Sequence, residues 1–275
     1  MDRILFDSHA HINNEGYSRI ERMELIEKLE SSSLRYVMDV GFDLESSKLA
    51  IKDAQSCNWC YAVIGVHPHD ASTLTDETIC ELKKMASNPK VKAIGETGLD
   101  YYRNLSPQNV QREAFRKQIR LAKELKMPLV IHDRDSGGEC IEIIKDEGMF
   151  SDERKSLFPS NPVTKVADAR VLLHCFSGSA EQALEYVKMG ATISIAGPVT
   201  YKNNKKTVAV AEKTPIEHLL IETDSPYLTP EPKRGKPNDS TNVEYVARKI
   251  AEIKGMSFED VAKITAENAK RFYNI

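Results

Sequence analysis

Histidines and carboxylates in a few short runs are the residues of this sequence best suited to metal chemistry. The first run, DSHAH at residues 7–11, follows an apolar run at residues 4–6. Because the side chains of a strand alternate between its faces, His9 and His11 are expected to point the same way and could share one divalent cation. Asp7 has the same parity, so we expect it one layer deeper, where its carboxylate could orient a ligand histidine.

The other candidate residues also lie at the ends of predicted strands. Short β-branched apolar runs predict eight strands, namely Ile4–His9, Tyr36–Val40, Tyr61–His67, Val91–Glu96, Pro128–His132, Val171–His174, Ala191–Ile195 and Leu219–Asp224. All of the seven histidines except His218 lie at or just after the C-terminal end of a predicted strand, as do Glu96 and Asp224. A scatter without function would hardly produce this pattern.

Helical stretches separate the predicted strands. Ser179 with Gln182 three residues later predicts the start of one helix by a capping box, and Gly190 predicts its end. Eight βα units in 275 residues predict an α/β fold, a closed (β/α)8 TIM barrel forming one domain over residues 1–275, with its active site at the C-terminal mouth of the strands. An open doubly wound sheet is the alternative, but it would normally carry a glycine-rich phosphate turn after its first strand.

The types of side chain indicate which metals could bind. Imidazoles with carboxylates and without thiolates suit Zn, Mn, Fe, Co or Ni better than copper(I), and Mg is possible with fewer histidines. Four histidines and two carboxylates exceed what one tetrahedral ion needs, whereas two divalent ions about 3.5–4 Å apart and bridged by a carboxylate would use them all. Glu96, midway round the barrel, is the expected bridge. The full candidate set is His9, His11, Glu96, His132, His174 and Asp224.

Longer motifs match a known family in order along the chain. They are FDSHAH (6–11), GVHPHD (65–70), GETGLDYYRNLSPQ (95–108), IHDRD (131–135), HCFSGS (174–179), ETDSPYL (222–228), RGKPN (234–238) and ENAKRFY (267–273). By these motifs the chain resembles the TatD-type metal-dependent deoxyribonucleases of the amidohydrolase superfamily over essentially its whole length. It departs from them in a lengthened connection at residues 148–170, outside every motif.

The resemblance implies a ligand set and a reaction. One ion would be held by His9, His11, Glu96 and Asp224, and a second by Glu96, His132 and His174. The reaction implied is hydrolysis of phosphodiester bonds in DNA, with 3′ exonuclease or abasic-site activity in some members. Other members resemble D-aminoacyl-tRNA deacylases, so hydrolysis of another ester, including a small phosphoester or lactone, stays open. A barrel that only binds nucleic acid is disfavoured by the intact ligand set.

Roles within the reaction follow from position. Asp224 could take the proton of the attacking water or hand it to the leaving oxygen, or serve purely as a ligand. Glu222 has the same strand parity and is expected behind the ligands rather than among them. His67, and His69 beside it, lack an obvious place on a metal and are expected to contact substrate, with a packed proline turn as the alternative.

Basic side chains near the mouth are candidates for binding phosphate. Arg134 could hold a phosphate through its planar fork, or pair with the neighbouring Asp133 or Asp135. Arg234 and Lys236 lie in a proline-rich connection, residues 225–241, that follows the last strand at the mouth; they are expected to contact phosphate or to form a solvated basic loop. Tyr101 and Tyr102 could stack on a base or cover the rim of the barrel.

Composition sets the wider frame. A hydrophobic share of 41%, a charged share of 29% and a net charge of −3 are typical of a globular protein without a basic field, so nucleic acid must be bound by a local patch or by metal. No run is long and apolar enough for a membrane span. Met1–Arg3 runs directly into the first strand, so we expect no signal peptide and a cytoplasmic protein with no obligatory protein partner. Five cysteines, including C-x-x-C at 57–60, are expected to be reduced thiols.

Overall fold

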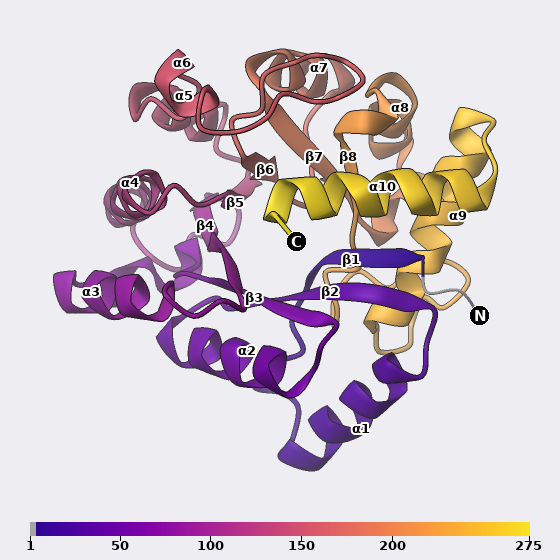
Figure 1. Cartoon of the computed structure of the whole chain (residues 1–275), viewed down its shortest axis with the longest axis horizontal. Helices are drawn as coiled ribbons and strands as arrows, with labels where there is room; N and C mark the ends of the chain where they lie inside the picture. Colours follow the sequence, from indigo (N-terminus) through magenta and orange to yellow (C-terminus); the bar gives the residue numbers. More distant parts are fainter. Residues whose placement is uncertain (1–3) are drawn as a thin grey trace.

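The computed structural model describes residues 4–275, so Met1–Arg3, which bear on the expectation about a signal peptide, lie outside the described residues. Over residues 4–275 the chain forms one sheet of eight parallel strands in the order of the sequence (Figure 1). The strands are β1 (Leu5–Ala10), β2 (Leu34–Val40), β3 (Cys60–Ile64), β4 (Val91–Asp100), β5 (Leu129–Arg134), β6 (Val171–Leu173), β7 (Ala191–Ile195) and β8 (Leu219–Ile221).

Helices alternate with the strands and surround them. They are α1 (Arg19–Glu30), α2 (Leu44–Ser56), α3 (Asp76–Met85), α4 (Gln108–Glu124), α5 (Glu139–Asp146), α6 (Asp152–Lys155), α7 (Ala180–Met189), α8 (Lys205–Lys213), α9 (Val243–Lys254) and α10 (Phe258–Tyr273). Short 3₁₀ turns are η1 (Pro68–Thr73), η2 (Gly197–Thr200), η3 (Ile216–His218) and η4 (Ser240–Asn242). Helix α7 begins with the expected capping box of Ser179 and Gln182 and ends at Gly190 in the left-handed conformation.

Backbone contacts between β1 and the segment that follows β8 nearly close the barrel. Ala10 pairs with Ser225 in a parallel bridge. The His11 N–H donates to the Ser225 carbonyl at 2.8 Å, and the Asp224 N–H donates to the His9 carbonyl at 3.0 Å. The expected (β/α)8 barrel is therefore confirmed, and these contacts bring the first and last candidate runs together at the mouth.

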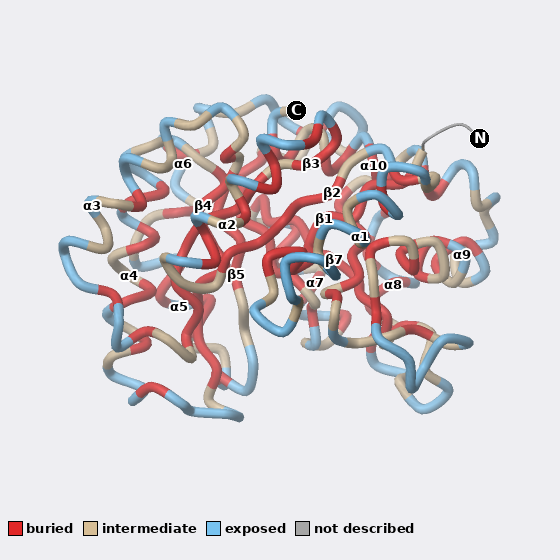
Figure 2. The backbone as a smooth tube through the Cα atoms, turned by 90° about the horizontal axis from the view of Figure 1, so that it is seen from below, coloured by how far each residue is buried: buried red, intermediate tan, exposed pale blue. Residues whose placement is uncertain are grey.

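The inside of the barrel is filled by apolar side chains at its N-terminal end. Inward residues of the strands pack with the last turns of α10, which lies across that opening (Figure 1). The Tyr273 hydroxyl donates to the Ser8 carbonyl at 3.0 Å. Figure 2 shows the strands buried at the centre and the exposed residues on the outer helices and loops. The buried polar residues of the candidate runs lie beyond this apolar layer, toward the C-terminal ends of the strands.

Strand ends differ from the predicted ones where the chain leaves regular pairing. Strand β4 runs four residues beyond Glu96, because Gly98 pairs with His132 and Asp100 with Arg134 of β5. A Cβ at Gly98, whose φ is +142°, would lie 1.9 Å from the His132 carbonyl oxygen, so glycine permits this close approach. Strand β8 instead ends at Ile221.

The lengthened connection, residues 148–170, lies at the N-terminal end of the barrel, as expected. The buried Arg154 of α6 donates to the carbonyls of Ala169 at 3.2 Å and Met127 at 2.5 Å, residues that precede β6 and β5. Thr164 lies 2.7 Å from Nε2 of His218, the histidine that does not belong to the mouth. The connection therefore braces the far end of the barrel and does not reach the candidate site.

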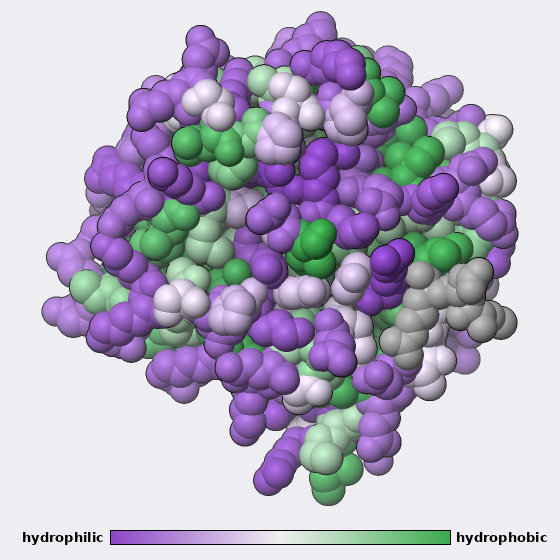
Figure 3. Space-filling model, viewed as in Figure 1, coloured by the Kyte–Doolittle hydropathy of each residue, from purple (hydrophilic) through white to green (hydrophobic). Residues whose placement is uncertain are grey.

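The surface of the barrel is mostly polar. Figure 3 shows a largely hydrophilic face on which hydrophobic residues gather only in small, separate groups. Within residues 4–275, no helix combines the length and the apolar character needed to cross a lipid bilayer. The thiols of Cys57 and Cys60 are buried and form no disulfide within the described part of the chain.

Candidate metal centre

Glu96 lies at the centre of the candidate residues, and its two carboxylate oxygens face different imidazoles. Oε1 lies 2.7 Å from Nε2 of His174 and 3.0 Å from Nδ1 of His132. Oε2 lies 3.3 Å from Nε2 of His9 and 3.7 Å from Nε2 of His11. A carboxylate in this position could contribute one oxygen to each of two ions, as expected for a bridge.

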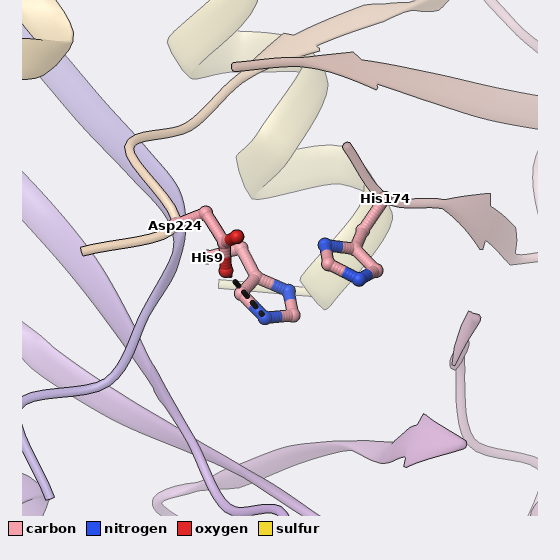
Figure 4. A group of neighbouring side chains, drawn as sticks. All are labelled: His9, His174 and Asp224. Carbon is pink, nitrogen blue, oxygen red and sulfur yellow. Dashed lines mark ion pairs between the residues drawn. The ribbon is translucent and has the colours of Figure 1, made fainter. Parts of the chain in front are cut away.

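Asp224 completes the side of the cluster that faces Oε2. Its Oδ1 lies 3.5 Å from Nε2 of His11 and 3.9 Å from Nε2 of His9. Figure 4 shows Asp224 and His174 beside His9; the His9 and His174 rings are stacked, with their centroids 4.0 Å apart. The structure thus brings together all six residues that the sequence predicts as ligands.

His9 gives an independent indication that a cation belongs in the cluster. It is fully buried, and neither ring nitrogen makes a hydrogen bond of acceptable geometry with any residue from 4 to 275. Burial and the adjacent His174 lower the pKa of His9, so the ring is neutral and its nitrogen lone pair is available. A buried polar nitrogen without a partner is costly, and coordination of a divalent ion would satisfy it.

Two other imidazoles have their outer nitrogens occupied by hydrogen-bond acceptors. Nδ1 of His11 lies 2.7 Å from the Val40 carbonyl oxygen, and Nδ1 of His174 lies 3.3 Å from Oε1 of Glu222. A carbonyl or carboxylate requires a proton on the facing nitrogen, so Nδ1 of each ring keeps its proton, and Nε2 is the nitrogen that could release a proton and bind a cation. Glu222 thus lies behind a candidate ligand, as expected, and also accepts a hydrogen bond from Ser194.

Asp100 holds the outer nitrogen of His132, and the sequence pattern did not reveal it. Its Oδ2 lies 3.2 Å from Nε2 of His132 and 2.9 Å from Nε2 of His69. Asp100 is fully buried. Asp100 lies an even number of residues after Glu96 in GETGLD, which would place both side chains on the same face of a longer strand. The predicted strand ends at Glu96, so Asp100 was not included. With Nε2 of His132 donating to Asp100, Nδ1, which faces Oε1 of Glu96, is the nitrogen that could bind an ion.

Asp100→Asn should weaken ion binding at the Oε1 side of Glu96 by about 10–100-fold, the usual cost of losing a hydrogen bond that orients a ligand histidine. Asparagine keeps the shape but offers an acceptor on only one of its two terminal atoms. Calorimetric titration of metal-free protein with Mn²⁺ or Zn²⁺ measures the effect. Asp133→Asn is the matched control, since that carboxylate accepts from Ser136. Equal affinities in the two variants would contradict the role given to Asp100.

Asp7 differs from its expected role. Its carboxylate accepts hydrogen bonds from the backbone N–H of Thr223 at 2.9 Å and from the Thr223 hydroxyl at 2.6 Å, and it reaches no imidazole nitrogen among the described residues. The β1–β2 pairing shifts register between Asp7 and Ala10, so strict alternation along β1 does not predict the partners of Asp7. Asp7 instead holds Thr223 in place, the residue before Asp224. Asp224 itself has a φ of +53°.

The carboxylates of the cluster are held in the charged form. Burial would raise the pKa of Glu96, but the His174 and His67 imidazoles and hydrogen bonds from the histidines hold it well below its usual range. Burial likewise opposes ionisation of Asp224, but His11 and His9 lower its pKa. Burial favours neutral imidazoles, but the same carboxylates raise the pKa of His11, to about 9, and that of His174. A divalent cation entering the cluster would therefore take the place of protons between the buried anionic oxygens and the imidazole nitrogens.

His67, expected to contact substrate, lies at the edge of the same cluster. Its Nε2 is 3.5 Å from Oε1 of Glu96, and its Nδ1 accepts the backbone N–H of His69 at 3.1 Å. Only 8% of the residue is exposed. His67, Glu96 and His132 each have one possible ligand atom within 4.8 Å of the other two. Distance alone therefore does not show whether His67 is a ligand.

Arg134 is the last residue of β5, Arg234 and Lys236 lie in the connection after β8, and both arginines are stacked on aromatic rings. The guanidinium of Arg134 lies 4.1 Å from the centroid of the exposed Tyr102 ring and makes no ion pair with the described carboxylates. That of Arg234 lies 4.4 Å from the centroid of Tyr201. Lys236 is exposed. The alternative of an Arg134 ion pair with its neighbouring aspartates is therefore not observed.

Comparison with known proteins gives a consistent result. The sequence model of a family described as TatD related DNase matches residues 6–274. The metal-dependent hydrolase YabD of Bacillus subtilis is 43% identical over 99% of this chain and 100% of its own. A protein of Cronobacter sakazakii named 3′-5′ ssDNA/RNA exonuclease TatD is 30% identical over 98% of this chain and 97% of its own. The solved structure of YJJV, a TatD homologue of Escherichia coli, superposes with a TM-score of 0.86 at 23% identity and covers 100% of both chains.

Proposed function

The chain belongs to the TatD related DNase family, and from that premise we propose that it is a metal-dependent hydrolase that cleaves phosphodiester bonds of DNA, with one barrel domain over residues 1–275. The observation that carries this proposal is the position of Glu96, one oxygen of which faces His132 and His174 and the other His9 and His11. Such a division suits a pair of ions better than a single one.

Roles follow from this division. We assign His9, His11, Asp224 and Oε2 of Glu96 to one divalent ion. His132, His174 and Oε1 of Glu96 are assigned to the other. The two ions, Zn, Mn, Mg, Co or Ni, would lower the pKa of a bound water to near neutral pH. They would also balance the negative charge of the phosphate.

Proton transfer is assigned to Asp224. It is the more exposed of the two candidate carboxylates, with 16% of its side chain accessible against 5% for Glu96, so water can reach it. Its lowered pKa keeps the carboxylate ionised at neutral pH, ready to accept the proton of the attacking water. Protonated Asp224 could then pass that proton to the leaving oxygen.

Arg134, Arg234 and Lys236 are assigned to the DNA backbone. A stacked guanidinium loses less conformational freedom on binding than a free one and still presents its N–H edge to a phosphate. The exposed Tyr102 ring beneath Arg134 adds an aromatic surface on which an unpaired base could stack. This pairing of cation and ring favours a nucleic acid over a small neutral ester.

Charge reversal at Arg234 or Lys236 should weaken DNA binding and flatten its salt dependence, by a slope of about 1 in log K against log salt for each phosphate that is no longer bound. Fluorescence anisotropy with labelled single-stranded DNA, from low to moderate salt, measures the slope. Lys165→Glu provides the same change of net charge on an exposed residue at the opposite end of the barrel. If the slope changes equally in Lys165→Glu, Arg234 and Lys236 do not contact phosphate and only form a solvated basic loop.

The function itself is tested by offering two substrates to protein loaded with Mn²⁺ or Mg²⁺. End-labelled single-stranded DNA reports phosphodiester cleavage, and D-aminoacyl-tRNA reports hydrolysis of a carboxylic ester. We expect shortened DNA, loss of activity in EDTA and recovery on adding metal. Release of the amino acid with DNA left intact would favour the alternative, an ester hydrolase acting on misacylated tRNA.

A further inference from the structure

The proton on each imidazole can be placed from what its outer nitrogen contacts. His11 faces the Val40 carbonyl, His174 faces Glu222 and His132 faces Asp100. Each of these partners is an acceptor, so each outer nitrogen keeps its proton. The inner nitrogen of each ring is then the one that can give up a proton and offer a lone pair to a cation.

His67 has the opposite arrangement. Its outer nitrogen, Nδ1, faces the backbone N–H of His69 at 3.1 Å, and a backbone N–H can only donate. Nδ1 must therefore be unprotonated, and the neutral ring carries its proton on Nε2, the atom 3.5 Å from Oε1 of Glu96. Coordination of a cation through Nε2 would require an imidazolate or the loss of the bond to His69.

We infer that His67 is not a metal ligand, and that its Nε2–H donates a hydrogen bond to a phosphoryl oxygen of the substrate. This inference rests on the proposed function for the identity of the acceptor. Charge grows on the phosphoryl oxygens in the transition state, and a buried, fixed donor stabilises that charge without reorganisation. His67 is thus assigned as a catalytic residue distinct from Asp224, which moves a proton.

The surrounding backbone fixes the direction of this donor. His67 is the N-cap of η1, with Pro68 at the first position of the turn. The His67 N–H donates to the Phe42 carbonyl at 2.7 Å. Both backbone groups of Val66, the preceding residue, bond to the buried Gln118 side chain at 2.8 Å. The ring is therefore anchored from both sides in sequence.

Nitrogen-15 NMR of the intact protein tests the proton position directly. The seven histidines, labelled selectively with ¹⁵N in the ring, can be recorded in metal-free protein and after loading with Zn²⁺. We expect His67, identified by its absence in His67→Asn, to show a protonated Nε2 in both states, whereas the inner nitrogens of His11 and His174 shift on loading. A shift of His67 Nε2 to a metal-bound value would overturn the inference.

Two variants separate donation from ligation and from capping. Asparagine is among the best N-caps and can accept the His69 N–H, but it is too short to reach the substrate; glutamine is long enough to place an amide N–H near the position of Nε2. We expect both to retain the metal content of the wild type. Turnover should fall by about 10²–10³-fold in His67→Asn, as for loss of a preorganised donor, and less in His67→Gln. Loss of metal from His67→Asn, or unchanged turnover, would overturn the assignment.

The substrate used keeps this inference separate from the proposed function. Bis(4-nitrophenyl) phosphate is a diester without bases, and 4-nitrophenyl acetate is a carboxylic ester with the same leaving group. Failure of loaded wild-type protein to cleave any phosphodiester would reject the proposed function, and the acceptor named for His67 with it. The NMR result and metal content would still decide whether His67 is a ligand. Cleavage of the diester with equal rates in wild type and His67→Asn would reject only the donor.

Discussion

Glu96→Gln should weaken both proposed ion sites together and abolish most of the activity. Each carboxylate oxygen faces a different pair of imidazoles, so a single change alters both sides. Glutamine offers one carbonyl oxygen and one NH₂ group, and the NH₂ group would point at a cation on one side. We expect the affinity of each site to fall by more than the roughly 10–100-fold that removal of a hydrogen bond behind a ligand costs.

Metal analysis after dialysis against graded free Mn²⁺ or Zn²⁺ measures this effect. Glu222→Gln is the matched control, because among residues 4–275 Glu222 contacts the cluster through Nδ1 of His174 and should affect the side that His174 serves. If Glu96→Gln keeps one site fully loaded while the other empties, the carboxylate belongs to one ion and the bridge is wrong.

The barrel and the six candidate ligands could be predicted because they depend on local pattern. Apolar runs identify strands, parallel strands in a barrel end at one mouth, and histidines or carboxylates at those ends must therefore converge. Glu96, His132 and His174 follow from this rule alone. That argument needs no knowledge of which side chains touch.

The remaining parts of the site depend on contacts between distant residues. Asp7 bonds to Thr223, 216 positions away, and no alternation rule could name that partner. Asp224 lies beyond β8 in a left-handed conformation, so its inward direction does not come from strand parity with Glu222. Asp100 could be predicted only from a strand that continues beyond its apolar residues. In the structure β4 continues because Gly98 pairs with His132 of β5.

The proton on His67 is a further case. The sequence motif does not distinguish His67 from the histidines that could bind metal. The backbone N–H of His69, which contacts Nδ1 of His67, indicates that His67 is a hydrogen-bond donor and not a metal ligand. The same limit applies to Arg134, whose neighbours in sequence suggest an ion pair while its contact in space is the Tyr102 ring. Residue types indicate that a metal hydrolase is present, and hydrogen-bond partners assign the roles.

Asp224→Asn should lower kcat by on the order of 10²–10⁴-fold, the range for lost proton transfer, with a much smaller change in KM. Asparagine keeps the shape of the side chain and one weak oxygen ligand but cannot accept the proton of water. Thr223 and its bonds to Asp7 are untouched, so the left-handed turn that presents residue 224 should persist.

Metal content should fall only in part in Asp224→Asn, because His9, His11 and Glu96 remain on the same side. The decisive measurement is therefore the rate at saturating metal. If excess Mn²⁺ or Zn²⁺ restores the rate, Asp224 acts only as a ligand and the proton leaves by another route. If the site fills and the rate stays low, the lost function is proton transfer. In that case an activated leaving group such as 4-nitrophenolate, which needs no proton from the enzyme, should recover part of the rate only if Asp224 also serves as the acid.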